Sequence, residues 1–249
     1  MAVIAIVVFV CLAGAVALGM TMSRWLAAHH LSSESRDTVK LALGLVATLA
    51  ALLLGLLVSS AKGTFDAERE QVNALAAKIA TLDRVLALYG AEAAGARGEL
   101  RIVIEGAIAQ IWPTRDGASS DLSFDAGRGE AIFRSIASLN PATPLQSDLK
   151  ARATGLAFEL IEGRSMFVAL ATGGISVPVL TLVIAWLFVI LFGFSILAPR
   201  NAVAVGALIV SAVAVCGAVL LLLELYTPFD GVIRISADPL LAALGPPAR

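Results

Sequence analysis

Charged side chains are scarce in this 249-residue sequence, and they are unevenly distributed along it. Only 15% of the residues are charged and 59% are apolar, whereas an average soluble domain has about 25% charged residues. Of the 37 charged residues, 26 lie between Lys62 and Ser165. The sequence therefore predicts that the chain has two parts, one embedded in the membrane and one water-facing domain.

The sequence also has no excess of basic residues and no pair of cysteines placed to form a disulfide or metal site. The formal net charge is −1, so no basic surface is available to neutralise phosphates, and nucleic acid is excluded as a partner. The two cysteines, Cys11 and Cys216, both lie in apolar runs. This excludes a disulfide framework and a CxxC metal site, and we interpret both cysteines as small packing residues.

Few residues could support catalysis or bind a metal. His29 and His30 are adjacent, so on a helix they point about 100° apart, and no third ligand is near. Asp116, Asp121 and Asp125 do not have the spacing of a calcium-binding loop. The sequence contains no nucleophile–base motif. We therefore expect no enzyme activity, no cofactor and no metal.

Four uncharged runs are each long enough for a helix that crosses a bilayer, which needs about 20 apolar residues. The first run has no basic residues before it and is longer than the apolar region of a signal peptide, so a retained helix is expected. A short loop, 24–40, should follow that helix. The four predicted membrane helices cover residues 1–23, 41–61, 175–197 and 202–223.

Four crossings would place both termini, the domain 62–165 and the C-terminal tail 224–249 on one side of the membrane. Basic residues flank the predicted helices evenly, so the positive-inside rule decides little. Arg24 directly follows the first helix, while no charged side chain precedes it. This favours an orientation with the domain on the outer side.

The domain 62–165 has the apolar periodicity of a small helical bundle. A heptad pattern from Phe65 to Tyr89 predicts that the second membrane helix continues to Tyr89, and the apolar seam could pack within the chain or between copies. Further helices are expected at about 92–111 and 129–139, and from Pro144 with Thr143 as N-cap. The fold class expected is an all-α membrane protein, with a helical domain inserted between spans two and three.

The fourth predicted span carries small residues at spacings of three and four, which form one side of a helix. Such a surface, here called the small-residue stripe, lets helix backbones approach closely in lipid. It could pack within one subunit or join two subunits. The centres of the spans carry no ionisable residue, which argues against a proton-coupled transporter. The stripe consists of Ala204, Ala207, Ser211, Ala214 and Ala218.

Charged residues gather near the ends of the spans. Glu224 ends the fourth span, where a carboxylate opposes the helix dipole, so it needs a partner. The segment 232–235 after it has a strand-like apolar pattern, and Asp238–Pro239 begins a last helix. The tail could simply connect the last span to the domain, or these charges could surround a pore mouth. The candidate cluster is Glu224, Asp230, Arg234, Arg164 and Lys62.

Several blocks of the sequence resemble one family. The blocks are 41–66, 81–101, 192–205 and 223–240, and the last, LELYTPFDGVIRISADPL, is the most specific. They are similar to the bestrophin-like family of bacterial four-span membrane proteins, a domain family without an assigned activity. The resemblance covers most of the chain and implies a polytopic protein with four spans. We expect it in the bacterial inner (plasma) membrane, and the charge distribution around the first helix favours a periplasmic domain. The bestrophin label implies a homo-oligomeric anion channel.

Two functions follow as hypotheses. The first is a homo-oligomeric, ion-channel-like pore, since charges occur only at the span ends. The alternative is a non-enzymatic membrane scaffold whose domain 62–165 binds a protein partner. In either case the lipid bilayer is the expected surrounding of the apolar helices.

Overall fold

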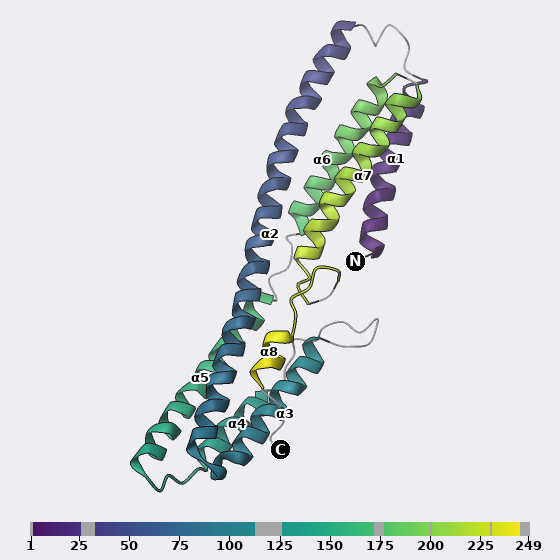
Figure 1. Cartoon of the computed structure of the whole chain (residues 1–249). Helices are drawn as coiled ribbons and strands as arrows, with labels where there is room; N and C mark the ends of the chain where they lie inside the picture. The colour runs from purple at the N-terminus through teal and green to yellow at the C-terminus, as the bar shows by residue number, and fades with distance from the viewer. Residues whose placement is uncertain are drawn as a thin grey trace. The chain divides into compact units, whose positions relative to one another are not determined.

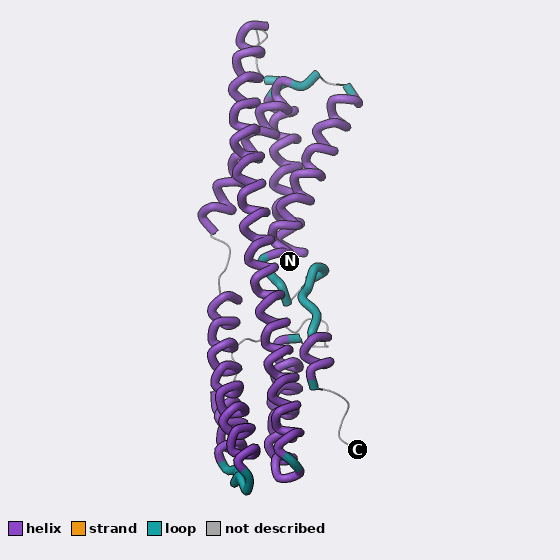
Figure 2. The backbone as a smooth tube through the Cα atoms, turned by 60° about the vertical axis from the view of Figure 1, so that its left-hand side comes forward, coloured by secondary structure: helices purple, strands orange, loops and turns teal. Residues whose placement is uncertain are grey.

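The computed structural model describes residues 2–25, 33–112, 126–171, 177–199, 201–229 and 231–244. All regular elements in these ranges are helices, and none is a strand (Figures 1 and 2). The chain forms two compact units. The first unit consists of residues 1–63 and 174–226, and the second of residues 64–173 and 227–249. The prediction of an all-helical fold is confirmed.

Four apolar helices form the first unit. Three of them are long and apolar enough to cross a membrane, and α1 contributes a shorter apolar stretch, Ile6–Met22. Helical structure is what lipid requires, because each backbone N–H and C=O must find its partner within the segment. The helices are α1 (Ala2–Met22), the first part of α2 (Ser33–Tyr89), α6 (Val177–Leu197) and α7 (Ala202–Leu225).

The core of the first unit lies between α1, α6 and α7. Each helix contributes a face of buried aliphatic side chains, and α1 uses small residues where it approaches its neighbours. Leucines of α2 pack at the edge of this core. The buried residues are Val8, Leu12, Ala15 and Val16 of α1, Val183, Leu187 and Leu191 of α6, and Ala212, Val219 and Leu223 of α7.

The second unit is a helical bundle with its own core. Leu82, Leu86 and Tyr89 of α2 are buried against residues from the other helices, so the predicted heptad seam packs within the chain. α2 ends at Tyr89, and the next residue, Gly90, has a φ of 124°, which is strongly disfavoured for residues with a Cβ. The further elements are η2 (Ala91–Ala93), α3 (Ala94–Ile111), α4 (Ala126–Ala137), α5 (Pro144–Ala171) and α8 (Asp238–Ala243).

Side-chain caps position the helices of this bundle. The Thr143 hydroxyl accepts a hydrogen bond from the Gln146 backbone N–H (3.2 Å), as the N-cap prediction requires. The Gln146 side chain accepts in turn from the Ala142 N–H. Lys150 donates to the carbonyls of Ala137 and Leu139, both at 2.7 Å. A cation thus satisfies carbonyls at the end of α4, where the helix dipole favours positive charge.

The structure departs from the sequence-based expectation in three segments. Residues 33–40, predicted as part of the loop 24–40, are helical because α2 begins at Ser33. Residues 232–235 form no strand; the Ile235 N–H donates to the Pro228 carbonyl (2.7 Å) within an irregular segment. α5 continues past Ser165 to Ala171. His29, His30, Asp116, Asp121 and Asp125 lie outside the described residues.

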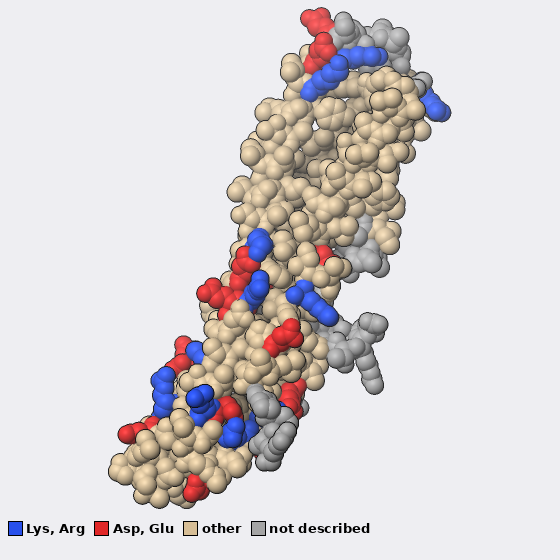
Figure 3. Space-filling view, in the orientation of Figure 1, with Lys and Arg blue, Asp and Glu red and all other residues tan. Residues whose placement is uncertain are grey.

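Charged side chains are distributed as the composition indicates. On the face drawn in Figure 3, Lys, Arg, Asp and Glu are scattered over the second unit and occur toward the helix ends of the first, while the flanks of the apolar helices carry none. Water-exposed charge and lipid-compatible surface are therefore divided between the two units.

Candidate functional site

The small-residue stripe lies mainly on the exposed side of α7. Ala207, Ser211 and Ala214 are exposed, and Ala204 and Ala218 are half-buried. The buried face of the helix consists instead of residues such as Ala212, Cys216 and Val219. Most of the stripe is therefore not used to pack α7 inside the first unit, and its role in helix association stays a prediction.

A groove runs beside this stripe. It has a volume of about 510 Å³ and is lined by aliphatic and aromatic residues of α6, small residues of α7, and Lys40 of α2. Ala204, Ala207 and Ser211 belong to its lining, together with Leu191 and Phe194. A shallow apolar groove bordered by a small-residue surface is suited to receive a further helix.

The five charges of the candidate cluster are divided between the units. Lys62 and Glu224 belong to the first unit and Arg164 and Arg234 to the second, while Asp230 lies outside the described residues. Lys62, Arg164 and Glu224 each interact with another group of the chain, which agrees with the expectation that Glu224 needs a partner. Arg234 is exposed. A charged ring around a pore mouth therefore stays a prediction.

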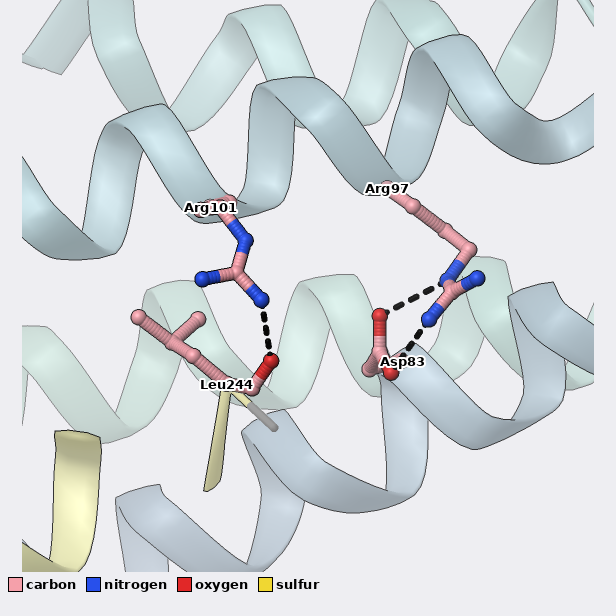
Figure 4. Close-up of polar contacts among 4 residues, drawn as sticks. All are labelled: Asp83, Arg97, Arg101 and Leu244. Atoms are coloured by element: carbon pink, nitrogen blue, oxygen red, sulfur yellow. Dashed lines mark hydrogen bonds and ion pairs between the residues drawn. The ribbon is translucent and has the colours of Figure 1, made fainter. Parts of the chain in front are cut away.

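The C-terminal tail packs on α3 within the second unit. The Trp112 indole N–H donates to the Ile235 carbonyl (2.7 Å), and its ring meets Phe229 edge-on with centroids 5.4 Å apart. Arg101 donates to the carbonyl of Leu244 at 2.5 Å (Figure 4). These contacts hold Phe229, Ile235 and Leu244 on the bundle of the second unit.

Asp83 and Arg97 form the best-aligned ion pair among the described residues. Arg97 donates from Nε and from one terminal nitrogen to the two carboxylate oxygens, at 2.8 and 2.9 Å (Figure 4). The hydrogen bond to Asp83 raises the pKa of Arg97. Because the pair joins α2 to α3 across the turn at Gly90, it fixes the relative register of these helices.

We expect a double-mutant cycle to detect this pair. Asp83→Asn and Arg97→Gln, alone and together, should yield a coupling of about 1 kcal/mol at low salt, since bidentate geometry exceeds the usual surface pair. Lys78–Glu159, at 3.3 Å and more exposed, is the matched control and should couple more weakly. Unfolding in urea, followed by fluorescence, measures both. Equal coupling of the two pairs would contradict the assignment.

Glu68 is a buried carboxyl group on α2, beyond the uncharged run 41–61. It is 3% exposed, and its Oε2 atom has no hydrogen-bond partner among the described residues. Burial raises the pKa of Glu68 above its ordinary value of 4.5, because desolvation disfavours the charged form. Its exposed charged neighbours suggest a solvated position, but Glu68 lies three residues after Phe65 and four before Val72, on the apolar seam of the heptad pattern.

Replacing Glu68 should stabilise the protein in a pH-dependent way. The native state holds the proton more tightly than the unfolded chain, so wild-type stability falls as pH rises above about 4.5. Glu68→Met should therefore gain about 1 kcal/mol or more at neutral pH, the cost of an unsatisfied buried polar group, and progressively less toward pH 4.5. Thermal unfolding across pH checks this. The exposed Glu70→Met should show no such trend, and a gain independent of pH would contradict the explanation.

Among the described residues, no three His, Cys, Asp or Glu side chains form a group able to hold a metal ion. The features that sequence reasoning missed are of another kind. Glu68, the Arg97–Asp83 pair and the tail contacts all depend on which residues meet across helices. Two signals were available in the sequence: the place of Glu68 on the heptad seam, and the Asp83–Arg97 spacing across Gly90.

Comparison with known proteins gives one match. A model of the bestrophin-like domain matches residues 10–240. No curated protein and no solved structure matches the chain. The matched range includes the apolar helices of the first unit, the bundle of the second and the tail as far as Leu240. The resemblance drawn from the sequence blocks is thereby confirmed, and this chain belongs to the bestrophin-like family.

Proposed function

We propose that this chain crosses the bacterial inner membrane four times and assembles into a homo-oligomeric, ion-channel-like pore. Three of the crossings are the apolar helices within α2, α6 and α7. α1 supplies the fourth, because it is 21 residues long and packs along α6 and α7, and 21 residues span about 30 Å. The proposal assigns no reaction to the chain.

The observation that carries the proposal is the exposure of the small-residue stripe. Helices associate in lipid through close packing of small residues rather than through burial from water. Ala207, Ser211 and Ala214 are exposed in a single copy, beside the groove between α6 and α7. A second copy that places a helix in this groove would use both features. Bestrophin-like membership favours an ion-conducting assembly.

Crosslinking and conductance test the proposal together. Purified protein should crosslink as a defined oligomer in native membranes, and reconstitution into planar bilayers should produce ion conductance. Ala214→Leu should weaken both, since a bulky side chain separates the helices. Val213→Leu, on an exposed neighbouring position outside the stripe, should change neither. A monomer, or an oligomer without conductance, would contradict the pore and leave a scaffold with a protein partner at 62–165.

Sidedness is tested separately. The proposal places the second unit in the periplasm. A cysteine at the exposed Ser147, in a background in which Cys11 and Cys216 are serine, should react with a membrane-impermeant maleimide added to intact spheroplasts. Labelling only after lysis would place the unit in the cytoplasm.

A further inference from the structure

The second unit contains an apolar cavity of about 130 Å³. Residues of α2, α3, α4, α5 and α8 line it, so it lies within the bundle rather than on one helix. Protein interiors are closely packed and contain few voids larger than a water molecule. A space of this size therefore needs a particular set of side chains around it.

Three small residues leave room for the cavity. Ala107 of α3, Gly129 of α4 and Ala157 of α5 all line it. Apart from its own helix, a Cβ added at Gly129 would meet one atom within 4 Å among the described residues, Ile161 Cγ1 at 3.8 Å. Three helices thus contribute side chains that are too short to fill the space between them.

The remainder of the wall is mainly branched aliphatic. Half of the described lining residues are valine or isoleucine, and several of them, such as Val72, Ile79 and Ile132, are more than nine-tenths buried. In a helix, these two residue types have one strongly preferred χ1 rotamer. They cannot readily rotate into the cavity and close it, so the cavity is preformed.

The wall presents almost no polar surface. The Trp112 indole N–H is donated to the Ile235 carbonyl (2.7 Å). Arg164, the one charged residue among the described lining residues, has a buried Nε atom and interacts with another group of the chain. A charged ligand would lose its hydration here without gaining a partner, so the cavity favours an uncharged molecule.

The wall reaches the surface of the bundle between α4 and α5. Ile161 lines the cavity and is 37% exposed, and Gly129 beside it is half-buried. A ligand could enter there by displacing one isoleucine side chain, with no change in the helices.

We propose that this cavity binds a small, uncharged hydrocarbon of about six or seven carbons, such as a simple arene. An engineered cavity of about 150 Å³ with an apolar lining stays free of water and binds benzene. The acyl chain of a lipid spans half of a hydrocarbon core about 30 Å thick and is too long to fit. Binding is measured without assembly or conductance, so this site stands or falls separately from the proposed pore.

Quenching of Trp112 fluorescence tests the site, because this indole ring is part of the cavity wall. The full chain in lipid nanodiscs carries phenylalanine at Trp25 and Trp186, and iodobenzene, a contact quencher, is titrated in. Binding in the cavity should give saturable quenching that benzene reverses. Iodobenzene dissolved in lipid quenches in proportion to its concentration, so quenching without saturation would overturn the proposal.

Variants of the wall locate the binding site. Ala107→Phe fills the cavity and should abolish the saturable quenching, whereas Ala109→Phe, on the exposed side of the same helix, should retain it. Equal saturation of these two variants would overturn the proposal.

Enlarging the cavity provides a second comparison, which holds even if Ala107→Phe does not fold. Leu160→Ala removes part of the wall and should admit 1-iodonaphthalene. The parent protein and the control Leu145→Ala, at a position 67% exposed on the same helix, should exclude this larger ring. The same response of all three proteins to 1-iodonaphthalene would overturn the assignment to this cavity.

The class of ligand is tested by competition. Benzoate has the ring of benzene and a negative charge, so it should displace iodobenzene about tenfold or more weakly than benzene. Equal displacement would overturn the assignment of an uncharged ligand. In nanodiscs of lipids brominated at the chain ends, Trp112 should be no more quenched in the parent protein than in Ala107→Phe. Stronger quenching in the parent would show that a lipid chain fills the cavity and would overturn a free hydrocarbon as its ligand.

Discussion

Substituting Gly19 by alanine should lower the melting temperature of the first unit by several degrees. A Cβ at this position would lie 2.6 Å from the Phe192 carbonyl oxygen and 2.6 Å from Ser195 Cβ. The first of these atoms belongs to the backbone of α6, so no side-chain rotation relieves the clash and α1 must move away. Overpacking costs about 1–3 kcal/mol, which corresponds to roughly 2–12 °C in a chain of this size.

Gly14→Ala on the same helix is the matched control. A Cβ there meets nothing within 4 Å, so the substitution should be neutral or slightly stabilising. Thermal unfolding can be followed by the fluorescence of Trp186 on α6, in a background in which Trp25 and Trp112 are phenylalanine. If both alanine variants melt with the parent protein, the close approach of α1 and α6 at Gly19 is wrong.

Truncating Leu86 should cause a large loss of stability in the second unit. Leu86 is fully buried in a cluster with Leu100 of α3, Ile136 of α4 and Leu156 of α5. Leu→Ala at such a position costs about 2–5 kcal/mol, because transfer energy is lost and a cavity remains. We expect the unfolding transition of this unit to move to markedly lower urea concentration.

Leu88→Ala is the control on the same helix, two residues away. Leu88 is 66% exposed, and exposed substitutions usually change stability by less than about 0.5 kcal/mol. Fluorescence of Trp112, with Trp25 and Trp186 replaced by phenylalanine, reports this unit. Equal losses for Leu86→Ala and Leu88→Ala would mean that the heptad face is packed between copies rather than within the chain.

Much of the helical architecture could be predicted, because apolar runs and heptad spacing are local properties of the chain. The pattern from Phe65 to Tyr89 predicted the end of α2 correctly, and the Thr143–Pro144 pair predicted the start of α5. The start of α2 was predicted incorrectly. Residues 33–40 contain several charged side chains, and such a composition is typical of a loop. The strand-like reading of 232–235 failed because two or three alternating apolar residues without a partner strand do not make a sheet.

The amino-acid sequence alone determined which segments can leave water. Placing a charged side chain in lipid costs free energy, so the uncharged runs can enter the membrane and the charged segment 62–165 cannot. It also determined the helical periodicity of both units. Only the tertiary structure decided which side of α7 stays exposed, why Gly19 cannot carry a side chain, and that Arg164 lines an apolar cavity. These properties depend on contacts between residues distant in sequence, where the approach of a second helix sets both space and solvation.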